Sequence, residues 1–82
     1  MPSSVIQRMI YDAKTRTLEI LFRGARGRYR YFEVPLDVWG AFRFAPSKGT
    51  YLNETFKELD FRYEKVGPGA RELRGETWSG DA

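Results

Sequence analysis

The side chains best suited to binding chemistry form an alternating run of arginine and tyrosine in the middle of the chain. Arg26, Arg28 and Arg30 recur at every second position, with Tyr29 and Tyr31 directly after Arg28 and Arg30. In a β-strand, alternate residues share a face and lie about 6.6–6.8 Å apart, so the arginines would line one face and the tyrosines the other. Guanidinium groups at this spacing can contact successive phosphates, and tyrosine rings can stack on unpaired bases.

Both halves of this run also have a purely structural interpretation. The arginines would suit a solvated outer face that keeps an edge strand from aggregating. The tyrosines would suit the core, because a small domain needs its large rings for burial. Both alternatives stay open for each group. The residues that we predict to contact nucleic acid are Arg23, Arg26, Arg28, Arg30, Phe32 and Lys48.

A second candidate site lies at Ser47, Lys48 and Gly49, directly before a stretch with helical periodicity. The free backbone N–H groups at a helix start favour anions, and Lys48 would add an accessory phosphate contact. The simpler interpretation is that the Ser47 hydroxyl caps the helix by accepting a hydrogen bond from a backbone N–H group. The sequence is not a P-loop, because the glycine-rich lead-in and the Lys-Ser/Thr ending are missing.

Composition argues against catalysis and against a bound metal. The 82 residues include no Cys and no His, so thiol nucleophiles, imidazole bases and the usual zinc ligands are missing. The carboxylates show no close pairing that would indicate a general acid and a general base. We therefore expect a protein that is not an enzyme and that uses no cofactor.

Hydrophobic periodicity predicts the elements that position these residues. Pro35 suits the first turn of a helix and Ser47 suits an N-cap. The predicted fold class is α+β, a three-stranded antiparallel β-meander followed by two helices packed on one face (β-β-β-α-α). The predicted strands are 5–11, 17–23 and 28–34, and the predicted helices are 35–45 and 48–59.

The chain divides into a predicted domain at 1–65 and a flexible Gly-rich tail at 66–82, which contains four Gly and one Pro. The domain holds 12 basic and 8 acidic residues, so the net positive charge of the chain lies within it. The sequence shows no signal peptide and no membrane-spanning run, which favours a cytoplasmic protein without a membrane partner.

Five motifs together resemble the KTSC domain, which is named for its occurrence at the C-terminus of some lysyl-tRNA synthetases and also forms single small bacterial or phage proteins. The resemblance covers about residues 4–65. The motifs are Tyr11-Asp12, Leu18-Glu19-Ile20-x-Phe22, Tyr29-Arg30-Tyr31-Phe32, Val34-Pro35 and the run from Pro46 to Asn53, which reads Pro-Ser-Lys-Gly-x-Tyr-x-Asn. The segment Gly24-Ala25-Arg26-Gly27-Arg28 is longer and more basic than the turn that the family leads us to expect.

The resemblance implies a suggested role in RNA binding and carries over no catalytic residue. The family motif residues that we expect to be structural are Tyr29, Tyr31, Pro35, Ser47, Gly49, Tyr51 and Asn53. We predict a non-catalytic module that binds RNA or another polyanion through the basic hairpin. The alternative is a protein-interaction module that uses Leu21 and Phe32 as an exposed apolar patch and binds no nucleic acid.

Overall fold

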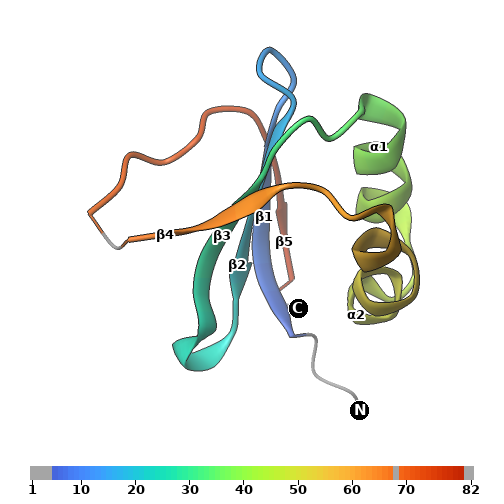
Figure 1. Ribbon diagram of the computed structural model, residues 1–82. Coiled ribbons are helices and arrows are strands. Elements are labelled where there is room, and N and C mark those ends of the chain that lie inside the picture. The colour runs from blue at the N-terminus through green and yellow to red at the C-terminus, as the bar shows by residue number, and fades with distance from the viewer. Residues whose placement is uncertain (1–4, 68, 81–82) are drawn as a thin grey trace.

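A single antiparallel sheet forms the centre of the molecule, and helical segments cover one of its faces (Figure 1). The structure is a computed structural model that describes residues 5–67 and 69–80. The strands lie side by side in the order β4-β3-β2-β1-β5. Their bounds are β1 Ile6–Asp12, β2 Thr17–Phe22, β3 Gly27–Tyr31, β4 Tyr63–Val66 and β5 Glu76–Ser79.

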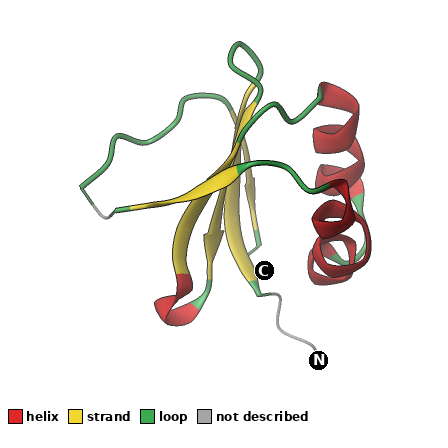
Figure 2. Ribbon diagram, viewed as in Figure 1, coloured by secondary structure: helices red, strands yellow, loops and turns green. Residues whose placement is uncertain are grey.

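Two helical stretches lie on the same side of the sheet, where the sequence predicted them (Figure 2). Helix α1 spans Leu36–Phe44, directly after Pro35. The second stretch is continuous over the predicted range but changes its winding on the way, and Ser47 caps it by accepting a hydrogen bond from the Thr50 N–H group at 3.3 Å. Its segments are α2 Lys48–Tyr51, a π-helical turn η2 Leu52–Phe56 and a 3-10 turn η3 Lys57–Leu59.

The α+β class is confirmed, but the prediction of a three-stranded sheet is wrong, because the described residues form five strands. Strand β4 pairs with β3, and Glu76–Ser79, which the sequence placed in the flexible tail, pairs with β1 as β5. Gly75 allows this approach, since a Cβ atom there would lie 1.9 Å from the carbonyl oxygen of Tyr11. The glycine that suggested flexibility is instead required for close contact between two backbones.

The third strand also ends earlier than predicted, at Tyr31. Glu33 takes a left-handed conformation with φ 56, which turns the chain out of the sheet. Phe32 therefore lies beyond the strand, although its N–H group still donates to the Arg62 carbonyl oxygen at 2.8 Å. The face of β3 that carries Tyr29 and Tyr31 is the face that the helices cover.

The core fills the space between this face and the helices. Tyr11 stacks on Trp39 with ring centroids 5.4 Å apart, and its hydroxyl donates to the Val34 carbonyl oxygen at 2.6 Å. The largest fully buried side chains are Trp39, Phe42, Phe56, Ile6, Met9, Leu18, Ile20 and Val34. Among the described residues, no helix is long and apolar enough to cross a membrane, and no group of acidic side chains is arranged to hold a metal ion.

Candidate functional site

Arg28 and Arg30 lie on the face of the sheet that the helices leave uncovered, where both of them contact Glu19. The Arg30 Nε donates to Glu19 Oε1 at 2.9 Å, and the Arg28 Nη1 donates to Glu19 Oε2 at 3.2 Å. The Glu19 side chain is only 2% exposed, so these two partners, and not water, compensate its negative charge. These two arginines therefore neutralise a buried carboxylate within the fold.

The segment that joins β4 to β5 lies on the same face, and its backbone carbonyl oxygens accept further hydrogen bonds from the two guanidinium groups. The Arg28 Nη2 donates to the carbonyl oxygens of Gly67 and Ala70, at 3.1 and 3.3 Å. The Arg30 Nη2 donates to the carbonyl oxygen of Arg71. Arg8 and Glu72 form an ion pair beside them. Gly67, Ala70 and Arg71 are thus held against the two arginines, whose side chains are 14% and 20% exposed.

Arg26 lies elsewhere, in the short 3-10 turn η1 (Gly24–Arg26) that joins β2 to β3. Gly27 follows with φ 85, and this conformation breaks the strand alternation that would place Arg26 above Arg28. The expected array of three guanidinium groups on one face does not form. Arg26 is exposed and lines a groove on the helix-covered side of the sheet.

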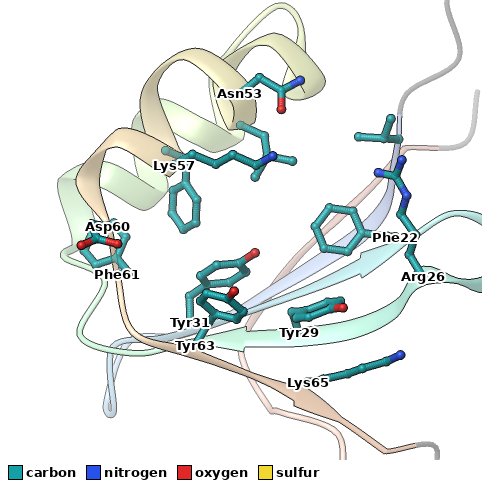
Figure 3. Close-up of a pocket in the computed structure, with 13 residues that line it drawn as sticks. Phe22, Arg26, Tyr29, Tyr31, Asn53, Lys57, Asp60, Phe61, Tyr63 and Lys65 are labelled. Carbon is teal, nitrogen blue, oxygen red and sulfur yellow. The ribbon is translucent and has the colours of Figure 1, made fainter.

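This groove lies between the sheet and the second helical stretch and has a volume of about 640 Å³. In Figure 3, the rings of Tyr29, Tyr31 and Tyr63 lie together on the sheet side, and Lys57 extends along the helical side of the groove. The lining residues are Val5, Phe22, Arg26, Tyr29, Tyr31, Leu52, Asn53, Phe56, Lys57, Asp60, Phe61, Tyr63 and Lys65.

The three tyrosines form one aromatic cluster at the bottom of the groove. The Tyr63 ring lies 6.0 Å from Tyr29 and 5.4 Å from Tyr31, centroid to centroid. Tyr31 also packs edge-on against the buried Phe56 at 4.9 Å. Burial raises the pKa of Tyr31 to about 12. Tyr29 and Tyr31 are half-buried, whereas Tyr63 is 59% exposed and presents its ring to the groove.

The charge of the groove is positive. Arg26, Lys57 and Lys65 line it, against the single carboxylate of Asp60. All three cations are exposed, and no carboxylate of residues 5–67 or 69–80 forms an ion pair with them. The Lys65 Cε lies 3.3 Å from the position of a Cβ atom on Gly27, so this lysine crosses the start of β3. Cations next to exposed rings are an arrangement that suits a polyanion with aromatic groups.

The sequence profile of the KTSC domain matches residues 2–63 of the chain. The chain therefore belongs to the KTSC domain family. A lysine–tRNA ligase of Nostoc punctiforme is 40% identical over 63 residues, and one of Trichormus variabilis is 38% identical over 63 residues. Each match covers 77% of this chain and 11% of the relative, so the chain spans about a tenth of the length of these curated relatives.

A solved structure has the same fold. The crystal structure of a KTSC domain protein from Yersinia pestis is similar with a TM-score of 0.72 and 37% sequence identity. The similarity covers 82% of this chain and 92% of that chain. The fold of this KTSC domain is thus shared with a solved member of the family.

The remaining predicted contact residues of this KTSC domain have partners within the protein. Phe32 lies under the Arg62 guanidinium group, 5.0 Å from the ring centroid. The Lys48 Nζ donates to the Ala45 carbonyl oxygen at 2.5 Å and lies 4.9 Å from the centre of the Trp78 ring. Burial lowers the pKa of Lys48. The Arg23 Nη2 donates to the Gly80 carbonyl oxygen at 3.4 Å.

Some of the family motif residues pack within the fold, and others line the groove. Tyr51 packs against Phe42 with centroids 4.7 Å apart, and Gly49 lies 4.0 Å from a methyl group of Val5 at the position where its Cβ would be. Pro35 precedes α1 as its N-cap residue. Asn53, by contrast, lines the groove, as do both tyrosines of the Tyr-x-Tyr motif.

Sequence reasoning missed Lys57, Asp60, Tyr63 and Lys65. One signal was present, because Asn53, Lys57 and Asp60 are four and three residues apart and therefore share a helix face. The other was the alternation of Tyr63 and Lys65, which places both side chains on one face of a strand. Pairing Tyr63 with Tyr31 and Lys65 with Tyr29 required the β3–β4 register, which only the structure supplies.

Proposed function

We propose that this KTSC domain is a non-catalytic module that binds RNA and that the groove is its contact surface. The observation that carries the proposal is the position of three exposed cations, Arg26, Lys57 and Lys65, around a cluster of tyrosine rings. Lysine and arginine supply the electrostatic attraction to phosphate, and aromatic rings supply stacking surfaces for bases. Relatives named lysine–tRNA ligase carry a matching segment, and a ligase of that name acts on a tRNA.

The groove replaces the arginine face as the proposed surface. Arg28 and Arg30 remain candidates from the sequence, but binding phosphate there would compete with the buried carboxylate of Glu19. Breaking such a pair leaves a charge with poor solvation inside the fold. The cations of the groove bear no such cost, because they are exposed and can exchange water for phosphate oxygens.

The test is a titration of the domain against a labelled single-stranded RNA at two salt concentrations. Three phosphate contacts predict that affinity falls by about 20-fold between about 50 and 200 mM salt, since each contact contributes a slope of about −0.7 on a log–log scale. A triple variant with Arg26→Ala, Lys57→Ala and Lys65→Ala should lose most of this dependence.

The matched control removes the same charge outside the groove, with Lys14→Ala, Arg71→Ala and Arg74→Ala. These three side chains are exposed, and none of them lines the groove. The control should keep the salt slope of the unmodified domain. Equal loss of affinity in both triple variants would show that binding follows net charge alone and would contradict the groove as the surface.

The protein-interaction alternative stays a prediction. Its proposed patch is small, because Leu21 is half-buried in the sheet and the Phe32 ring is covered by Arg62. Absence of RNA binding at both salt concentrations would contradict our proposal and favour this alternative. Isolation of partners with the intact chain as bait would then be the next measurement.

A further inference from the structure

We infer that the groove takes unpaired nucleotides, with a base stacked on Tyr63 and the adjoining phosphates bound by Lys65 and Arg26. This inference rests on the proposed RNA-binding function and deepens it, because it names the kind of RNA and the residue that selects it. Its starting point is Tyr63, a large ring that is 59% exposed although two neighbouring rings fix its position.

The neighbours of Tyr63 make its ring a preorganised surface. Tyr31 contacts it at 5.4 Å and is itself held by Phe56 at 4.9 Å, and Phe56 is 2% exposed. Tyr29 contacts it from the next position of β3, at 6.0 Å. A ring that is already fixed loses little conformational freedom when a base stacks on it, so stacking costs little in ordering.

The two ends of the groove differ in charge. Figure 3 shows Asp60 and Phe61 together at one end and Arg26 at the opposite end. Asp60 repels phosphate at its own end, whereas Lys65, two residues after Tyr63 on the same face of β4, attracts phosphate on the other side. Two residues along a strand span about 6.7 Å between Cα atoms. The Lys65 side chain extends away from Tyr63 as far as Gly27, so its ammonium group lies beyond this separation.

Unpaired RNA is favoured over a duplex for a geometric reason. The rings lie between the sheet and the helical wall formed by η2 and η3, so a base must leave a helical stack to reach them. In an RNA duplex the faces of each base are covered by its neighbours, and proteins contact mainly the backbone and the shallow groove. Bases in loops, bulges and single strands have free faces that can stack on Tyr63.

The experiment compares an unstructured RNA oligonucleotide with the duplex that it forms with its complement, using the intact chain at one salt concentration. We expect the single strand to bind at least tenfold more tightly. Tyr63→Ala should weaken single-strand binding by about 5- to 150-fold, the range measured for loss of one stacked base, while leaving the salt slope unchanged. Tyr63→Phe should retain the affinity, because it keeps the ring.

The matched control is Phe44→Ala, which removes a ring that is 76% exposed on α1 and does not line the groove. It should leave both affinities unchanged, and urea unfolding of each variant confirms that the fold is retained. Equal affinity for single strand and duplex, or full affinity in Tyr63→Ala, would overturn the inference while RNA binding itself stands. Absence of RNA binding by the unmodified chain would overturn the proposed function as well.

Discussion

Arg30 donates a 2.9 Å hydrogen bond from its Nε to the Oε1 of Glu19, across the pairing of β2 with β3. This contact explains why a run of arginines in a sheet is not sufficient to identify a binding surface. The Glu19 carboxylate is buried on the face of the sheet opposite the helices, so the arginines on the neighbouring strand serve as its counter-charges. Three exposed cations, Arg26, Lys57 and Lys65, line the groove on the other face.

Glu19→Gln is therefore predicted to destabilise the domain. The change leaves Arg28 and Arg30 without their carboxylate partner, at side-chain exposures of 14% and 20%. Breaking a buried ion pair from one side costs about 3–5 kcal/mol, and the partial exposure of the arginines places the expected loss near about 3 kcal/mol. Urea unfolding measures this loss, with Glu54→Gln at an exposed position as the control. An unfolding midpoint equal to that of the control would contradict the structural role of the pair.

Gly75→Ala is predicted to disturb the pairing of β5 with β1. The added Cβ atom would lie 1.9 Å from the Tyr11 carbonyl oxygen, so the backbone of one strand must move. We expect a loss of about 1–3 kcal/mol, typical of overpacking, together with faster hydrogen exchange of the backbone amides of β5. Gly69→Ala is the control, since nothing lies within 4 Å of its Cβ position. Unchanged exchange in Gly75→Ala would show that β5 is not docked as described.

The sequence predicts those elements of the fold that depend on interactions between residues close to one another in the chain. Helix bounds and the first three strands follow from local periodicity and from Pro35 and Ser47, which act within a few residues of themselves. Strands β4 and β5 are short, and only their pairing with β3 and β1 defines them. Local patterns do not contain this pairing, so the sequence predicts a flexible tail at 66–82 although these residues include β5.

The same limit applies to the candidate site. Tyr29 and Tyr31 could be identified from their spacing, but their surroundings depend on Tyr63, more than thirty residues away in the sequence. The sequence left core and stacking surface as alternatives for these two rings. In the structure they are half-buried and line the groove at the same time, because one edge packs on the core and the other is open.

Stability is predicted to fall in alkaline solution as Tyr31 titrates. Its pKa is about 12 in the folded state against an ordinary value of 10.0, so the folded state holds the phenolic proton more tightly. Its contribution is fully present below pH 10 and is lost as the pH rises from 10 toward 12. The expected loss is about 2 kcal/mol.

The measurement is urea unfolding at several pH values across this window, with Tyr31→Phe as the control because phenylalanine has no proton to lose. The unmodified domain should lose stability more steeply than the variant. Burial also raises the pKa of Tyr11 and Tyr51, so both proteins should retain part of the decline. Parallel curves for the two proteins would contradict the role of Tyr31.

Lys48→Ala is predicted to weaken the fold slightly and to leave RNA affinity unchanged. Its ammonium group donates to the Ala45 carbonyl oxygen and lies 4.9 Å from the centre of the Trp78 ring, so it links the start of α2 to β5. A cation next to an aromatic ring contributes about 0.5–1 kcal/mol at a partly exposed site. Lys57→Ala is the comparison, because Lys57 lines the groove and should lower RNA affinity and the salt slope. An equal loss of affinity in both variants would place the helix start, and not the groove alone, in the path of the RNA.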